Sequence, residues 1–434
     1  MEDRSLGIVS RPATLVVVSQ DSPVEPPRAN SPAALEQMLA SASPVWEIAQ
    51  SEPLTLLALS QSVDGGPLEA IARMDAHLLA SSGGSVLGLE DLGGDGGARW
   101  SVAIRVPQRE NAIILFAEEP QQFADPSHPS AALSDVQSTL GLSTPLESPF
   151  VEDFIRLVRL LHAASGELVA LVDPALDSVR LRADVQTLFL DAEPLADERA
   201  LFRTQIVSRG EGAPRWLFTE GMPRVGKPDF EMLEVDPSEE RAALTLLEVT
   251  AGLFVSRQLP PPETPFDLGV GVTIALVPPR EAFAGLAADV AGSARDREGE
   301  HAHFSPRVSA VLSAPHKRGA YRQVWTRPIE AIAALQRGEA ALALPDGVVR
   351  STAFRARASW SDVAKLRADA TRIEPILAQV SITSGTATEH AWVEVRSADA
   401  RGGSGILMHA LREGSRLKGA SVEFTLSQVT DWSA

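Results

Sequence analysis

The chain contains no cysteine among its 434 residues. Composition therefore excludes disulfide bonds, thiolate zinc sites, iron–sulfur clusters and a cysteine nucleophile. Aromatic residues are scarce at 5%, and Tyr321 is the single tyrosine, so the apolar core must come mainly from leucine, valine, alanine and isoleucine. The lack of cysteine also favours a reducing compartment.

Long hydrophobic runs are missing as well. The first apolar run, Leu15 to Val18, has four residues, far fewer than a signal-peptide core or a membrane span requires. We therefore expect a cytoplasmic protein without membrane contact. Lysine occurs four times and asparagine twice, whereas arginine is abundant, which is typical of GC-rich bacterial coding.

The residues that are present predict an ordinary globular protein. Hydrophobic residues make up 44% and charged residues 22%, which excludes disorder of the whole chain. The net charge of −18 is uneven, because residues 1–300 carry 22 basic and 45 acidic side chains and residues 301–434 carry 17 and 12. The acidic bulk argues against nonspecific nucleic-acid binding, while docking of the basic part onto an anionic partner stays open.

The fold class predicted from the pattern is α+β, with several domains built from mixed or antiparallel sheets and helices packed on them. The length exceeds the roughly 250–300 residues at which a single core stops growing. Strand-like runs such as Leu54 to Leu59 alternate with helical stripes such as Val151 to Leu161. The predicted divisions are an N-terminal α+β domain (1–119), a Pro/Ser/Ala-rich linker (120–149), a middle α+β domain (150–303), a connecting strand and helix (304–351) and a small C-terminal α+β module (352–434).

The C-terminal module carries three short motifs in a recognisable order. They are Glu389-His390-Ala391-Trp392-Val393-Glu394-Val395, then Gly405-Ile406-Leu407, then a final strand that closes in Asp431-Trp432. This order resembles the YegJ-like family, a bacterial domain of unknown function. The chain departs from the family at Met408-His409-Ala410, where relatives tend to carry an asparagine and a proline.

The middle region resembles another uncharacterised bacterial family between Leu201 and Leu253. The resemblance rests on the stretch from Trp216 to Glu231, where relatives often place histidines beside the threonine. Here Thr219 is flanked by Phe218 and Glu220, so the resemblance implies no histidine-based site.

The same stretch mimics a phosphate-binding loop. Gly221 to Lys227 fits the Walker spacing, but Pro228 stands where a serine or threonine hydroxyl must hold magnesium. The segment from Phe230 to Val235 alternates like a strand instead of continuing as a helix. We therefore predict a glycine-turned connection between two strands, without nucleotide binding.

The most distinctive candidate site lies on the strand from His390 to Arg396. Alternation places Ala391, Val393 and Val395 on one face. The opposite face then carries the four candidate binding residues His390, Trp392, Glu394 and Arg396. An exposed tryptophan beside an arginine is typical of binding hot spots. The alternative is that a further layer of structure covers the ring.

Two other clusters are weaker candidates. Arg318, Arg322 and Arg327 lie in a basic aromatic stretch, residues 307–327, that could contact an anion or nucleic acid, although the ordinary density of charge favours a solvated helix or strand edge. His301 and His303 have carboxylates nearby, but the surrounding charges favour an exposed loop, and we predict no metal site.

The function predicted from the sequence is that of a noncatalytic binding or protein-interaction protein acting through its C-terminal module. No nucleophile elbow or zinc-binding helix occurs, so no cofactor is expected and catalysis has no motif to support it. The alternative is an enzyme whose site is assembled from distant residues, for instance Asp229, Glu231 and His390. A homo-oligomer stays open.

Overall fold

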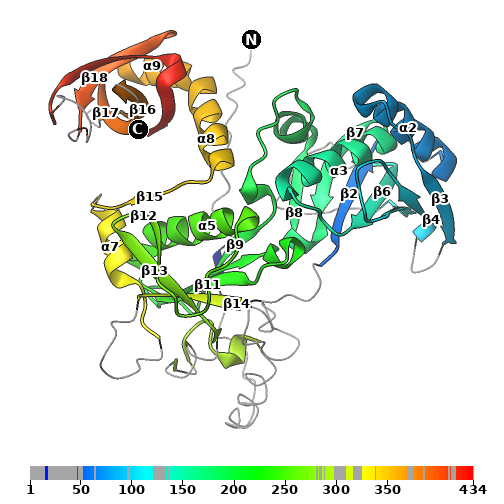
Figure 1. The fold of residues 1–434 in the computed structure, drawn as a ribbon, viewed down its shortest axis with the longest axis horizontal. Coiled ribbons are helices and arrows are strands. Elements are labelled where there is room, and N and C mark those ends of the chain that lie inside the picture. Colours follow the sequence, from blue (N-terminus) through cyan, green and yellow to red (C-terminus); the bar gives the residue numbers. More distant parts are fainter. Residues whose placement is uncertain are drawn as a thin grey trace. The chain divides into compact units, whose positions relative to one another are not determined.

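The computed structural model divides the chain into two compact units (Figure 1). The first unit comprises residues 1–194 and 198–343, and the second comprises residues 195–197 and 344–434. The structure describes residues 15–17, 46, 52–62, 65–94, 98–120, 133, 136–279, 282, 286–287, 289–297, 309–315, 325–337, 339–368, 375–384, 387–408, 411 and 417–433. The predicted α+β class is confirmed, since both units combine helices with largely antiparallel sheets.

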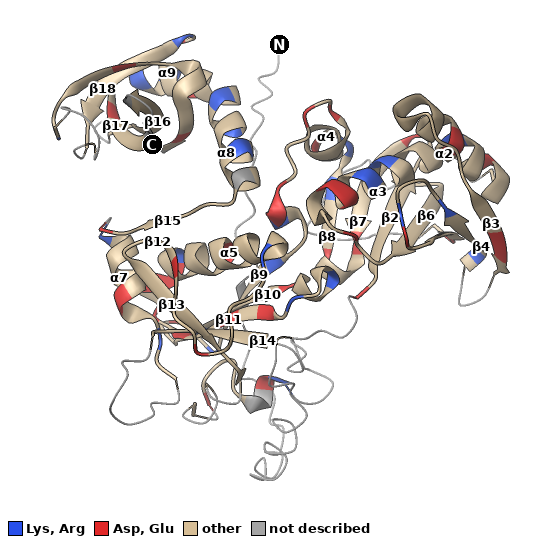
Figure 2. Cartoon of the chain, viewed as in Figure 1, with Lys and Arg blue, Asp and Glu red and all other residues tan. Residues whose placement is uncertain are grey.

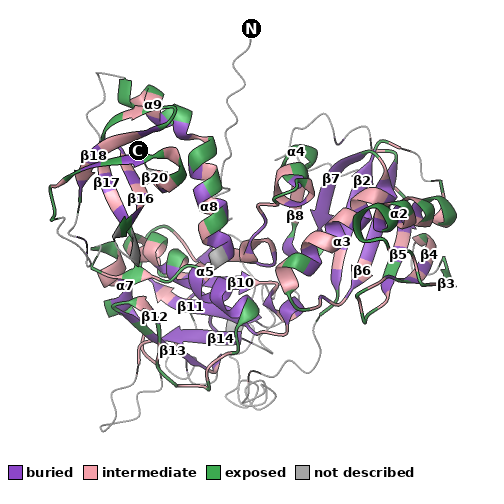
Figure 3. Ribbon diagram, turned by 45° about the horizontal axis from the view of Figure 1, so that its top comes forward, coloured by how far each residue is buried: buried purple, intermediate pink, exposed green. Residues whose placement is uncertain are grey.

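A seven-stranded antiparallel sheet forms the N-terminal part of the first unit, with the strand order β3-β4-β5-β6-β2-β7-β8. The strands are β2 (Leu54–Ser60), β3 (Gly88–Gly93), β4 (Ala98–Arg105), β5 (Ile113–Glu118), β6 (Ser138–Thr144), β7 (Leu168–Asp173) and β8 (Ser178–Leu181). Every residue of β7 is buried, and β2 and β6 are nearly so (Figure 3). The core of this sheet therefore lies at β6, β2 and β7.

Two helices pack side by side on this sheet, α2 (Pro67–Ser82) and α3 (Phe150–Ser165). Helix α2 has proline in its first turn and ends at Gly83, whose φ of 67° is left-handed and suits glycine. The buried stripes of both helices have helical spacing, with Ala70, Met74 and Leu78 on α2 and Phe154, Leu157 and Leu161 on α3. Beyond β8, the chain forms α4 (Arg182–Val185), which runs directly into a π-helix, η3 (Gln186–Leu190).

A mixed eight-stranded sheet forms the rest of the first unit, in the order β1-β9-β10-β11-β14-β13-β12-β15. Its strands are β1 (Leu15–Val17), β9 (Arg203–Ser208), β10 (Arg215–Glu220), β11 (Asp229–Val235), β12 (Phe266–Val270), β13 (Val272–Val277), β14 (Ser309–Ser313) and β15 (Ala341–Leu342). The pairs β1–β9 and β11–β14 are parallel, and the other pairs are antiparallel. Helix α5 (Glu240–Ser256) packs on β10 and β11, and α7 (Ile329–Gln336) packs on α5 and β13.

The predicted connection between two strands is confirmed at Gly221 to Lys227. Strands β10 and β11 are antiparallel neighbours, and a short 3-10 helix, η5 (Met222–Val225), joins them. Gly221 and Gly226 bracket η5 with φ values of 110° and 69°, a left-handed backbone that favours glycine. The loop therefore has a conformational reason for its glycines that involves no phosphate.

A buried ion pair ties this connection to the seven-stranded sheet. Arg224, at the end of η5, donates from Nη1 to Asp173 Oδ2 at 2.7 Å and from Nη2 to Asp173 Oδ1 at 3.2 Å. Asp173 ends strand β7, and its side chain is fully buried. Because burial of either charge alone would be costly, this bidentate pair fixes the contact between the two sheets of the first unit.

A second buried carboxylate lies at the centre of the eight-stranded sheet. Glu231 on β11 accepts a hydrogen bond from Trp216 Nε1 at 2.9 Å, and the hydroxyl of Ser309 on β14 also donates to it. Arg297, whose side chain is fully buried, donates to both carboxylate oxygens and places its guanidinium 4.6 Å from the centre of the Trp216 ring. The charge is thus paired, hydrogen-bonded and stacked on an aromatic face.

The second unit is a five-stranded antiparallel sheet with helices on one face. The strand order is β19-β18-β17-β16-β20, from β16 (Leu377–Ser384), β17 (Ala387–Asp399), β18 (Gly402–Leu407), β19 (Ser421–Thr425) and β20 (Val429–Ser433). Helices α8 (Asp346–Ala358) and α9 (Trp360–Ala368) pack on β20 and β17. Trp360 is 1% exposed, and its ring lies edge-on to Phe424 at 5.8 Å, so it anchors the core beneath the helices.

Several sequence expectations need correction in the described residues. The stretch 120–149, expected to be a linker, contains strand β6, which pairs with both β2 and β5 inside the sheet. Helix α8 runs across the proposed boundary at residue 352. The proposed division into domains as a whole stays a prediction.

The Glu231 network makes a stability prediction. Replacing Glu231 with alanine leaves the Arg297 charge buried without its partner, and we expect the free energy of unfolding to fall by about 3–5 kcal/mol. Urea unfolding followed by circular dichroism measures this change. The matched control is Glu339→Ala, which removes an exposed ion pair with Arg337 and should leave the unfolding midpoint unchanged. Equal midpoints for the two variants would contradict a structural role for Glu231.

Candidate functional site

The candidate residues of β17 lie on the face of the C-terminal sheet opposite its core. Ala391, Val393 and Val395 are at most 3% exposed and pack in the core of the second unit. His390 and Arg396 are exposed and Trp392 and Glu394 are half-buried on the other face, as the alternation along the strand predicts. Because α8 and α9 pack with the core, these four side chains lie on the face that the described helices of the second unit leave open.

Strand register places one polar and one apolar residue beside Trp392. Gln379 on β16 is the direct cross-strand partner of Trp392 on one side. On the other side, Met408 donates its backbone N–H to the Trp392 carbonyl at 2.9 Å, one residue beyond β18. In the adjacent row, Leu377, Glu394 and Ile406 lie opposite one another on β16, β17 and β18.

We call this surface the open face, and define it by Leu377, Gln379, His390, Trp392, Glu394, Ile406 and Met408. Met408 is 39% exposed, and the other apolar members are half-buried. An aromatic ring beside a flexible methionine gives an adaptable apolar centre. The alternation along β17 predicted Trp392 on this face, but it could not predict Met408 and Ile406, because only the register of β17 against β18 brings them into the same rows.

Polar groups surround this apolar centre. Arg396 Nη2 lies 2.9 Å from Glu394 Oε1, so these two side chains form an ion pair along one edge. His390 Nδ1 lies 3.3 Å from the hydroxyl of Thr430 on β20. Burial raises the pKa of Asp431, the cross-strand partner of Gln379, while a hydrogen bond from its own neighbour Trp432 N–H opposes that shift. The rim therefore offers donors, acceptors and a weakly acidic carboxyl group.

The other candidate basic residues are not gathered into a site among the described residues. Arg327 donates to the backbone carbonyl of Glu234 and lies 3.3 Å from Glu239 Oε2, so its charge is used within the fold. Arg318 and Arg322 lie outside the described residues, as do His301 and His303. Anion contact through residues 307–327 stays a prediction. In the part of the chain that the structure describes, no group of three or more metal-ligating side chains is found.

The acids named for a distant-residue enzyme site are both buried on β11. Asp229 Oδ1 accepts from the Thr219 hydroxyl at 3.1 Å and from the Met222 backbone N–H at 3.2 Å. The Thr219 hydroxyl also accepts from the Phe230 N–H at 2.8 Å. Asp229 and Glu231 thus hold β10, β11 and the loop between them together. His390 belongs to the other unit.

Comparison with known families places these carboxylates in a recognised segment. Residues 204–308 match the family model described as "Protein of unknown function (DUF4026) C-terminal", a match that covers less than half of the chain. Comparisons with curated proteins and with solved structures gave no match. The matched segment includes Trp216, Asp229 and Glu231 and assigns no activity to them. The bacterial family suggested for the middle region and the YegJ-like resemblance stay predictions.

None of the helices in the described ranges is both long and apolar enough to cross a bilayer.

The buried carboxyl group of Asp229 should make the stability of the protein depend on pH. Its burial raises the pKa of the carboxyl well above the ordinary value, and the hydrogen bonds from Met222 and Thr219 only partly offset this. The folded state therefore binds the proton more tightly than the unfolded state, so this group's contribution to stability falls as pH rises from the unfolded pKa to the folded pKa. Asp229→Asn keeps an acceptor oxygen and carries no charge, and we expect it to gain stability over the natural chain as pH rises.

Urea unfolding at a series of pH values between about 4 and 8 measures this difference, which linkage assigns to the one substituted group. Asp236→Asn is the control, because hydrogen bonds from Ser238 lower the pKa of that exposed carboxyl, so its contribution to stability should stay nearly constant over this pH range. A difference between the Asp229 variant and the natural chain that does not change with pH would contradict the prediction.

Proposed function

We propose that the protein is a noncatalytic binding protein that holds a polypeptide partner on the open face of its C-terminal unit. The observation that carries the proposal is the placement of Trp392 and Met408 side by side on a sheet face that α8 and α9 do not cover. Tryptophan and methionine are enriched at the centres of protein interfaces, where they supply area and adaptability.

The surroundings of this centre favour a polypeptide over a small molecule. A small-molecule site is concave and surrounds its ligand, whereas strand faces such as this one present side chains in flat rows. The rows alternate apolar groups with hydrogen-bonding groups, as in an interface with an apolar centre and a polar rim. The expected partner segment therefore presents apolar side chains to Trp392 and Met408, and backbone or polar groups to His390 and Gln379.

The three motifs that resemble the YegJ-like family lie on strands of this one sheet. His390 to Val395 belong to β17, Gly405 to Leu407 to β18, and Asp431 and Trp432 to β20. This placement supports the proposal that the second unit is a YegJ-like module. We also propose a bacterial, cytoplasmic setting, consistent with the absence of cysteine and the scarcity of lysine.

Trp392→Ala tests the open face as a binding surface. Trp392 is half-buried, and its loss should lower the free energy of unfolding by about 1 kcal/mol, in the usual range for single substitutions. Trp360→Ala is the matched comparison, since loss of a fully buried tryptophan costs about 3–5 kcal/mol. Equal losses of stability for the two variants would show that Trp392 serves the core.

Partner contact is tested by site-specific photocrosslinking of the full chain in its native cell. A photoreactive phenylalanine analogue at position 408 should give one discrete intermolecular adduct, and Trp392→Ala should abolish it. The same analogue at Lys365, which is exposed on α9, should not give that adduct. A crosslink from position 408 to the same chain, or identical adducts from both positions, would overturn the proposal.

A further inference from the structure

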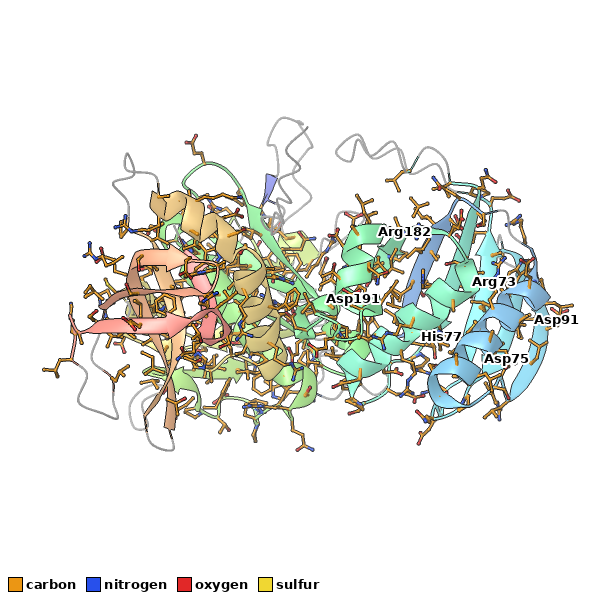
Figure 4. All side chains as sticks on the ribbon, turned by 90° about the horizontal axis from the view of Figure 1, so that it is seen from above. Arg73, Asp75, His77, Asp91, Arg182 and Asp191 are labelled. Atoms are coloured by element: carbon orange, nitrogen blue, oxygen red, sulfur yellow. The ribbon has the colours of Figure 1, made fainter. Side chains whose placement is uncertain are left out.

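A hollow of about 420 Å³ lies in the first unit, beside helix α3. His77 from α2, Arg159 and His162 from α3, and Gln186 and Leu190 from the π-helix η3 line it, and Asp191 and Ala192 complete the wall. Figure 4 shows His77, Arg182 and Asp191 in this part of the unit, whereas Asp91 lies apart on the edge strand β3. The volume is within the range of small-molecule sites, roughly 300–1,000 Å³.

Arg159 builds one wall of the hollow. Its Nε donates to the carbonyl of Phe189 at 2.7 Å, and its Nη2 donates to the carbonyl of Asp191 at 2.8 Å. The guanidinium therefore holds the end of η3 against α3. π-Helices occur frequently at functional sites, where they displace side chains from a regular helical position. Figure 2 shows basic residues along α3.

His162 has hydrogen-bonding capacity that the described fold does not use. Its Nδ1 is buried and has no hydrogen-bond partner among the described residues. Buried polar atoms are normally satisfied by protein, water or a bound group. The Nδ1 atom is closed to solvent, so it does not itself face the hollow that the His162 side chain lines. Gln186 and Asp191 bond to each other, from Nε2 to Oδ1 at 2.7 Å, so that carboxylate is already engaged.

Burial and nearby positive charge both disfavour protonation of the two imidazoles. Burial lowers the pKa of His77, and Arg159 lowers it further. Burial also lowers the pKa of His162, with smaller contributions from Arg182 and from His77 itself. Of the two arginines, Arg159 lines the hollow, whereas Arg182 lies outside its lining and acts on His162 through its charge. A ligand that brings negative charge would reverse this effect and favour their protonation.

We propose that this hollow binds a small oxyanion, with His77 and His162 donating from their imidazoles and Arg159 and Arg182 supplying the charge. The same residues fit a metal ion poorly, because His77, His162 and Asp191 do not form a ligand cluster among the described residues. Planar guanidinium groups and imidazole donors are suited to phosphate and carboxylate oxygens. This site is separate from the open face and does not depend on the function proposed for it.

The proposal is tested with sulfate, an oxyanion whose charge does not change across the histidine titration range. Proton NMR titration of the full chain resolves the histidine rings, with the signals assigned from His77→Gln and His162→Gln. At constant ionic strength, replacing chloride by sulfate should raise the pKa of His77 and of His162 and leave the other resolved histidines unchanged. Linkage requires sulfate to bind more tightly at lower pH, because protonation of these rings adds positive charge. The charged groups near the rings are Arg159, which acts on His77, Arg182, which acts on His162, and Asp191, which lines the same hollow.

Variants that remove a negative or a positive charge near the hollow should change its affinity for sulfate in opposite directions. Asp191→Asn removes a negative charge from the wall while keeping an oxygen acceptor for Gln186, and we expect sulfate to bind more tightly. Arg182→Gln removes an exposed positive charge that acts on His162 from outside the lining, and we expect sulfate to bind more weakly. Asp91→Asn is the control, because Asp91 lies on β3 and bonds to the Gly93 N–H, which asparagine can also accept.

Inorganic phosphate and acetate serve as second probes, which separate phosphate from carboxylate preference without changing the proposal. Shifts that chloride produces equally well, or shifts of equal size in all resolved histidines, would overturn it. Equal effects of Asp191→Asn and Asp91→Asn would do the same, because they would show general screening instead of a defined site.

Discussion

The Glu231 carboxylate is the interaction on which the eight-stranded sheet depends. Three elements distant in sequence meet on it, since Trp216 lies on β10, Arg297 precedes the segment leading to β14, and Ser309 begins β14. A lone buried charge would be intolerable, so none of these partners can be displaced without loss. The parallel pairing of β11 with β14, which closes a long connection, is therefore fixed by a directional contact as well as by apolar packing.

A structural role for these acids also accounts for the motif from Trp216 to Glu231. Thr219 bridges Phe230 and Asp229, Arg224 pairs with Asp173, and the glycines of the connection supply left-handed backbone. Thr219, Arg224 and Asp229, in the stretch that mimics a nucleotide loop, thus each have a partner within the fold. The matched family segment contains most of this network, so similarity there reflects architecture before it implies any reaction.

The sequence predicted the elements that have a strong hydrophobic periodicity. It missed the elements that are defined by their contacts with other strands and helices. β17 alternates cleanly, so its buried and open faces followed from its pattern alone. β6 consists of small and polar residues and contains Gly141, which faces Phe116 on β5 so closely that a Cβ would lie 2.1 Å from the ring. The glycine that resembles a linker residue is therefore a packing requirement of a central strand. Likewise, His77 and His162 are far apart in sequence, and only the packing of α2 on α3 brings them to one hollow.

The open face and the hollow would bind their ligands through different physical interactions. The open face has rows of half-buried apolar groups with few uncompensated charges, because Glu394 is paired with Arg396, so its affinity must come mainly from area removed from water. The hollow is lined by the Arg159 guanidinium and two imidazoles as well as by Leu190 and Ala192, and the affinity proposed for an oxyanion there depends on charge and should weaken with added salt. Because these dependences are opposite, binding on the two surfaces can be separated by ionic strength alone. Proton uptake by His77 and His162 would also strengthen the binding of an oxyanion in the hollow. The apolar centre of the open face, formed by Trp392 and Met408, has no group that titrates in this way.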